Sequence, residues 1–159
     1  MTTDPLVLVE DIRAATHRLI ASAAALDDVA VADASRLPGW TRGHVLTHVS
    51  RNADGATNLL TWARTGVPTH QYESLDQRVR DIEDGAGRAA AVQLADLRES
   101  AGRFAEAFAV MPAPAWTTKV AWANGRVGPA ALVAWFRLRE LCVPYRRSVS
   151  VDGCPIPEM

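Results

Sequence analysis

Apolar residues recur at steps of three and four along four long stretches of the chain, a pattern typical of amphipathic helices. Asp4 followed by Pro5 is a favourable helix start, and Thr41 is a candidate N-cap for the second stretch. Glycine and proline residues follow the second stretch and are expected to stop it. The four predicted helices cover about residues 4–26, 41–65, 88–110 and 129–142.

Two smaller elements are predicted between these helices. Residues 74–84 form a short, highly charged stretch that Gly85 and Gly87 are expected to close. Residues 116–122 alternate in polarity, and the turn dipeptide Asn124-Gly125 follows them. The sequence therefore predicts an all-α fold, a four-helix bundle with a small β-hairpin before the last helix.

Composition limits the class of protein. A chain of 159 residues with 48% hydrophobic residues suits one domain, and its arginine- and alanine-rich usage is typical of a high-GC genome. A net charge of −1 argues against sequence-independent binding to nucleic acid, and no apolar run is long enough to cross a membrane. Two cysteines are too few for a disulfide scaffold, so we expect a cytoplasmic protein.

Two polar residues interrupt the apolar stripes. His48 stands three residues after Val45 on the second helix, and Glu140 stands four residues after Phe136 in the middle of the last stripe. A buried carboxylate needs a cation, a metal or strong donors, because desolvation costs several kcal/mol. Either the two side chains share a divalent metal, or Glu140 pairs with a histidine or an arginine, and spacing alone favours the pair. The candidate arginines are Arg42, Arg51, Arg137 and Arg139.

Other polar groups are weaker candidates for a site. His44 is expected to face solvent or to cap a helix, and His17 is expected on the surface. The carboxylates of Asp81, Glu83 and Asp84 are read as a solvated face, and the five tryptophans as packing residues. We find no phosphate-binding loop, no Ser–His–Asp arrangement and no CxxC motif.

One long motif resembles a known family. Residues 37–54, which read LPGWTRGHVLTHVSRNAD, resemble the signature of mycothiol-dependent maleylpyruvate isomerase metal-binding domains, which are DinB-like four-helix bundles. The resemblance extends to residues 80–88 and 137–140 and spans nearly the whole chain. It implies a DinB-like metal-binding bundle over residues 1–143.

The resemblance also implies zinc ligands. Carried over residue by residue, the family's ligands are His48, Glu140 and a histidine at position 144, where this chain has Pro144. A proline inside a helix costs about 3 kcal/mol, so we expect the last helix to end at about Cys142. The third ligand is thus predicted to be lost, with no catalytic or cofactor-binding residues assigned.

The segment 144–159 is an atypical tail. Codons such as CCA-TAC-CGT-CGA-TCT would encode residues 144–148, and the same letters read one nucleotide later would encode His-Thr-Val-Asp and the start of a leucine codon. We hypothesise that a single-nucleotide change near the codon for Val143 replaced the original C-terminus.

The resemblance implies a function as well. In a family member with all its ligands, zinc holds the thiolate of mycothiol or a similar small thiol. The thiolate adds to the double bond of maleylpyruvate, and rotation and departure give fumarylpyruvate. The implied partners are this thiol and a small electrophilic substrate. The second hypothesis is a metal-free or vestigial helical-bundle binding protein without catalytic activity.

Overall fold

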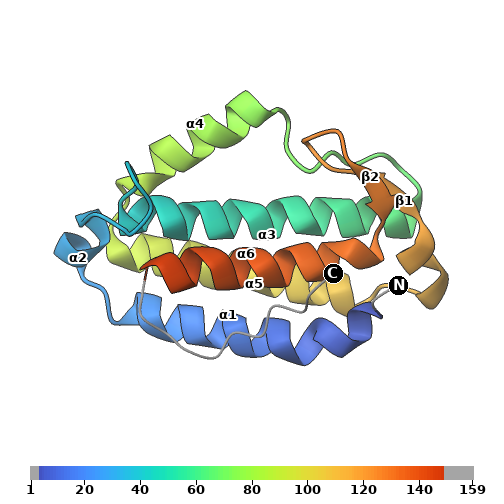
Figure 1. The fold of residues 1–159 in the computed structure, drawn as a ribbon, viewed down its shortest axis with the longest axis horizontal. Helices are drawn as coiled ribbons and strands as arrows, with labels where there is room; N and C mark the ends of the chain where they lie inside the picture. The colour runs from blue at the N-terminus through green and yellow to red at the C-terminus, as the bar shows by residue number, and fades with distance from the viewer. Residues whose placement is uncertain (1–3, 149–159) are drawn as a thin grey trace.

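Four long helices lie side by side in the computed structural model, which describes the backbone of residues 4–148 and the side chains of residues 4–143 (Figure 1). In chain order the elements are η1 Pro5–Leu8, α1 Val9–Ala24, α2 Asp28–Ala32, α3 Arg42–Thr65, α4 Leu75–Ala86, α5 Ala90–Ala109, η2 Ala113–Thr117, β1 Lys119–Ala121, β2 Val127–Pro129 and α6 Ala131–Ser148. The predicted four-helix bundle with a hairpin before the last helix is confirmed.

The bundle consists of α1, α3, α5 and α6. Helix α3 packs against α5 and α6, and α1 packs against the same two helices on the opposite side. Alanine and leucine side chains fill much of the space between them; Ala53 and Leu97 are fully buried. No helix in residues 4–148 is both long enough and apolar enough to span a membrane.

The central helix α3 begins and ends where the sequence predicts. The side chain of Thr41 accepts a hydrogen bond from the His44 amide, while His44 Nδ1 accepts one from the Thr41 amide. Gly66 ends the helix with a φ of 74°, a left-handed conformation that glycine adopts without strain. These two caps fix the ends of α3.

Helix α4 crosses above α3 and approaches its N-terminal half (Figure 1). Gly43 allows this approach, because a Cβ atom there would lie 2.1 Å from the Ala86 carbonyl oxygen. Contrary to the prediction, Gly85 does not close α4 but lies inside it. A Cβ atom at Gly85 would lie 2.6 Å from Thr47 Cγ2. Both glycines therefore serve the close packing of α3 and α4.

Four other features differ from prediction. The first helix starts as the 3-10 turn η1 before α1, and the short helix α2 was not predicted. Helix α5 starts at Ala90 rather than residue 88, and Asp28 of α2 accepts the Ala90 amide at 2.7 Å. Trp116 lies in η2 and not in a strand. The hairpin itself pairs Val120 with Gly128, and Gly125 occupies its turn with a φ of 83°.

The expectation that the last helix ends near Cys142 is wrong. Helix α6 continues to Ser148 and passes through Pro144. A proline removes one backbone donor and crowds the preceding turn, but packing of a helix face contributes more to helix stability than propensity does. Leu138, Leu141 and Cys142, immediately before the proline, are each 1% exposed. Residues 149–159, which make up most of the segment that the hypothesised frameshift would change, lie outside the described residues.

Candidate functional site

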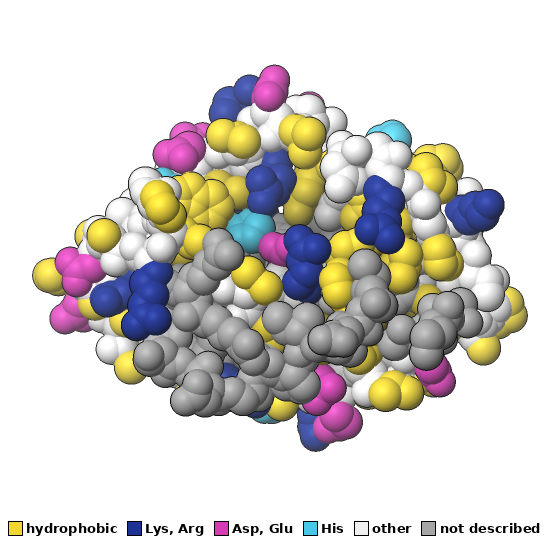
Figure 2. Space-filling view, in the orientation of Figure 1, with side chains coloured by type: hydrophobic (Ala, Val, Ile, Leu, Met, Phe, Trp, Pro, Cys, Tyr) yellow, Lys and Arg dark blue, Asp and Glu magenta, His cyan; other side chains and the backbone are white. Residues whose placement is uncertain are grey.

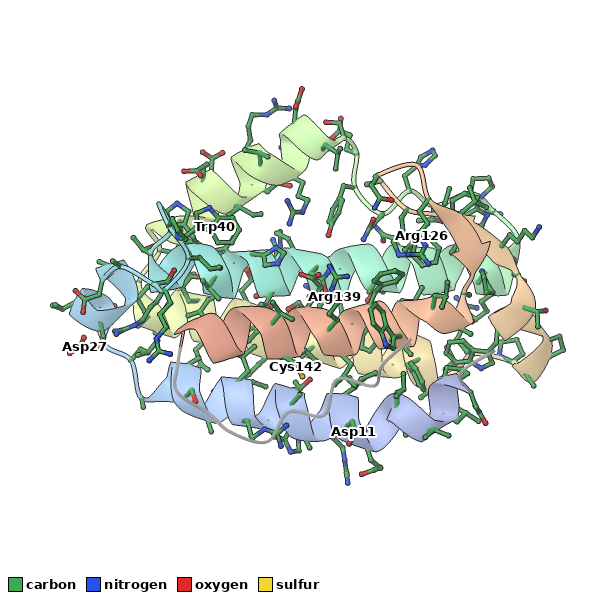
Figure 3. All side chains as sticks on the ribbon, in the orientation of Figure 1. Asp11, Asp27, Trp40, Arg126, Arg139 and Cys142 are labelled. Carbon is green, nitrogen blue, oxygen red and sulfur yellow. The ribbon has the colours of Figure 1, made fainter. Side chains whose placement is uncertain are left out.

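His48 lies on the buried face of α3. Its side chain is 9% exposed, and the neighbouring residues Val45 and Val49 are part of the apolar interior. The Trp40 ring packs edge-on against the His48 imidazole, with centroids 5.5 Å apart. Trp40 lies beside the N-terminal part of α3 (Figure 3). The imidazole is thus shielded from bulk water on the Trp40 side.

Glu140 reaches the same point from α6. Its Oε2 lies 3.0 Å from His48 Nε2, although 92 residues separate the two in the chain. Two ligand atoms at about 2.0–2.1 Å from a tetrahedral zinc lie about 3.3 Å apart. The two atoms therefore have nearly the spacing of neighbouring zinc ligands, and the structure brings together the two residues that the sequence singled out.

Glu140 is hydrogen-bonded to the histidine, and one of the four arginines first considered forms a longer ion pair with it. Arg139 alone among these approaches Glu140, at 3.7 Å. The others bind elsewhere: Arg51 to Asp54 and Asp96, Arg42 to Asp33 and the Ala30 carbonyl, and Arg137 to the Val49 carbonyl and Asn52.

Sequence reasoning missed Arg78. This arginine belongs to the first turn of α4, and its Nη2 lies 2.9 Å from His48 Nδ1. Its guanidinium also lies over the Tyr72 ring, 5.5 Å from the centroid. In the sequence Arg78 is one of several charged residues on a polar helix, so no local signal distinguishes it.

Burial and charge oppose each other at Glu140. Burial alone would raise the pKa of Glu140, but the hydrogen bond with His48 and the positive charges of Arg139 and Arg78 outweigh it and hold that pKa below its usual value. Glu140 therefore stays an anion at neutral pH and can act as an oxygen ligand.

The pair lines a pocket of about 300 Å³ between α3, α4, α6 and the hairpin. Figure 2 shows a histidine and an acidic side chain in a hollow bordered by basic and hydrophobic side chains. Figure 3 shows Arg139 on α6 and Arg126 near the hairpin, and both residues line the pocket. Gln71 accepts the Ala123 amide at 3.0 Å and ties the loop before α4 to the hairpin turn. Three guanidinium groups, from Arg78, Arg126 and Arg139, line this pocket.

Arg137 lies behind the pocket and is 2% exposed. Its Nη1 donates to the Val49 carbonyl at 3.0 Å and to Asn52 Oδ1 at 2.8 Å, and Asn52 lines the pocket. Burial lowers the pKa of Arg137 to about 10, against the attraction of Glu140. Within the described residues its Nε and Nη2 atoms have no hydrogen-bond partner. Arg137 thus holds Asn52 in position but is itself incompletely paired.

The weaker candidates take the structural roles expected of them. His44 caps α3 and contacts Glu83 at 3.3 Å; its side chain is 15% exposed, more than that of His48 but far from open to solvent. His17, Asp81 and Asp84 are exposed. Trp116, Trp122 and Trp135 are buried in the core, whereas Trp40 contacts His44 and His48.

A third metal ligand is not found among the described side chains. No group of three or more histidine, cysteine, aspartate or glutamate residues within residues 4–143 could hold a metal ion. Position 144 lies one helical turn beyond Glu140 on α6, and its side chain is outside the described part of the chain. The ligand roles of His48 and Glu140 stay predictions.

Comparison with known proteins identifies the family. The sequence profile of the mycothiol maleylpyruvate isomerase N-terminal domain matches residues 12–143. The crystal structures of the mycothiol-dependent maleylpyruvate isomerase and of a histidine-to-alanine mutant of it both superpose with a TM-score of 0.91, at 28% and 27% identity. Each covers 96% of this chain, which spans 65% of theirs, and no curated protein sequence matches. The chain therefore belongs to the family of the mycothiol maleylpyruvate isomerase N-terminal domain.

Proposed function

We propose that the chain is a zinc-binding, thiol-dependent isomerase or thiol transferase of the maleylpyruvate isomerase type. The carrying observation is the 3.0 Å approach of His48 Nε2 to Glu140 Oε2 in a pocket lined by arginines. Zinc, when bound, would hold the sulfur of mycothiol or a similar thiol as a thiolate at neutral pH. Such a reduced thiol is available in the cytoplasm, where we expect the protein to act.

The residues of the pocket fit an anionic electrophile. Arg126 and Arg139 present guanidinium groups beside the His48–Glu140 pair, and such groups bind carboxylates through paired hydrogen bonds. Phe136 and Trp122 add apolar surface to the same wall. A small unsaturated carboxylate such as maleylpyruvate would be oriented by these arginines, with its double bond near the metal ligands.

An activity assay with matched variants tests this function. We expect the zinc-loaded protein with mycothiol to convert maleylpyruvate to fumarylpyruvate, and His48→Ala and Glu140→Gln to lose both zinc and activity. His17→Ala, which changes an exposed histidine, should retain both. Stoichiometric zinc in His48→Ala would refute the assigned site.

The tail provides a second test. Because each lost ligand also loosens the remaining ones, the natural chain should bind zinc more weakly than a version with the alternate-frame tail, by about 10- to 100-fold or more. Pro144→His alone is expected to restore less than the whole tail. Equal zinc affinity for the three versions would contradict the assignment of position 144 as a ligand position.

A metal-free binding protein is the second candidate function. It is favoured by the hydrogen bond from Arg78 to His48 and by the absence of a third metal ligand within residues 4–143. Metal analysis of the purified protein distinguishes the two candidates, since a binding protein would carry no zinc and yet retain affinity for carboxylates.

A further inference from the structure

The hydrogen bonds of His48 determine which of its ring nitrogens carries the proton. A guanidinium has only N–H donors, so His48 Nδ1 must accept the bond from Arg78 Nη2 at 2.9 Å. A histidine with one accepting nitrogen is neutral and carries its proton on the other nitrogen. Nε2–H therefore donates to Glu140 Oε2 at 3.0 Å. The two contacts select a single tautomer.

That tautomer conflicts with the metal site of the proposed function, on which this inference rests. A zinc ion can bind Nε2 only through its lone pair, which places the imidazole proton on Nδ1. There the proton would face an N–H of Arg78, donor against donor. Zinc at Nε2 and Arg78 at Nδ1 therefore exclude each other.

Arg78 has space and partners for an alternative position. It is half-buried on a pocket wall, and its guanidinium already stacks on Tyr72. Helix α4 is packed against α3 through Gly43 and Gly85, whereas Arg78 lies in the first turn of α4. The side chain can thus swing from His48 into the pocket while the helix stays in place.

We propose that Arg78 is a positioning residue that exchanges between two partners. Without metal it holds His48 in the Nε2–H tautomer; with metal it is displaced into the pocket, where it joins Arg126 and Arg139 in binding a carboxylate ligand. Metal and carboxylate then favour each other's binding, because linkage between two sites is reciprocal.

The tautomer is tested first, without zinc. We expect the ¹⁵N spectrum of the metal-free protein, with His48 assigned by comparison with His48→Ala, to show a protonated Nε2 and an unprotonated Nδ1. Arg78→Met, which has no donor, should lose this preference. A protonated Nδ1 in the natural protein would overturn the inference and leave the proposed function untouched.

Zinc titration by calorimetry tests the exclusion. Arg78→Gln can turn its side-chain oxygen toward a protonated Nδ1, so it should bind zinc about tenfold more tightly than the natural protein. Arg78→Lys keeps both the charge and the donors and should resemble the natural protein. Arg78→Met loses the charge but gains no acceptor, so its comparison with Arg78→Gln separates the loss of charge from the gain of an acceptor. Arg80→Gln removes an equal charge from an exposed position of α4 and should change little.

The outcomes separate the two hypotheses. Equal zinc affinity in the natural protein and all Arg78 variants overturns the inference, whereas no zinc binding in any of them overturns the proposed zinc function and the coupling with it. With maleate as the probe, zinc should raise carboxylate affinity more in the natural protein than in Arg78→Met. An equal gain in both proteins would refute the displacement of Arg78 into the pocket.

Discussion

Glu140 is a half-buried carboxylate whose ionisation contributes to stability. Its pKa is held below the usual value, so its contribution is complete above pH 4.5 and is lost as the pH falls through the lowered pKa. We expect Glu140→Gln to lower the free energy of unfolding by about 1 kcal/mol at pH 7 and by progressively less below pH 4.5. Urea unfolding between pH 7 and pH 3 measures this difference. Glu106→Gln, at an exposed position of α5, is the control, and a pH-independent difference for Glu140→Gln would contradict the assignment.

Arg137 is a buried cation that the fold pairs only in part. Replacing it with methionine removes two N–H groups that lack partners within the described residues and a charge that burial disfavours. Methionine also leaves the Val49 carbonyl and the Asn52 side chain without the donor that Arg137 supplies, and this loss should dominate. We therefore expect Arg137→Met to lower the free energy of unfolding by about 1 kcal/mol, and Arg64→Met, on the exposed face of α3, to leave it unchanged. A gain of stability in urea unfolding would show that the unpaired donors and the buried charge outweigh these two hydrogen bonds.

At the scale of elements, the approach of α4 to α3 depends on Gly43. A methyl group at this position would lie 2.1 Å from the Ala86 carbonyl oxygen and 3.2 Å from Val31, so α4 would have to move away and carry Arg78 with it. We expect Gly43→Ala to lower the free energy of unfolding by about 1–3 kcal/mol.

Gly102 of α5 is a matched control, because its Cβ position is open. Gly102→Ala should raise the free energy of unfolding by about 0.5–1 kcal/mol through its helix propensity. If the two alanine variants behave alike in urea unfolding, close packing of α3 on α4 is not the reason for Gly43.

At the scale of the whole molecule, the His48–Glu140 pair connects α3 and α6 across the bundle. A metal that binds only the folded state would stabilise the protein by about 2.7 kcal/mol at a free concentration 100 times its Kd. For a domain of this size we expect zinc then to raise the Tm by roughly 5–10 °C. His48→Ala should lose this shift in a thermal denaturation assay and His17→Ala should keep it; an equal shift in both would place zinc elsewhere.

The sequence by itself determined the four long helices, the caps of α3 at Thr41 and Gly66, and the pair of polar residues that interrupt the apolar stripes. These features are local: a helical period of 3.6 residues and the chemistry of a cap are visible in neighbouring positions. His48 and Glu140 could be found in the same way, since a polar residue in an apolar stripe needs a partner.

Only the tertiary structure decided which partners those residues meet. Arg78 lies 30 residues from His48, and Asp28 caps α5 from 62 residues away; spacing along the chain gives no information on such contacts. Helix α6 likewise continues through Pro144 against a local preference to stop, and the part of the helix before the proline is packed in the bundle, with Leu138, Leu141 and Cys142 each 1% exposed. Side chains on separate helices become neighbours only when the helices pack, so the surroundings of the candidate metal ligands depend on the fold.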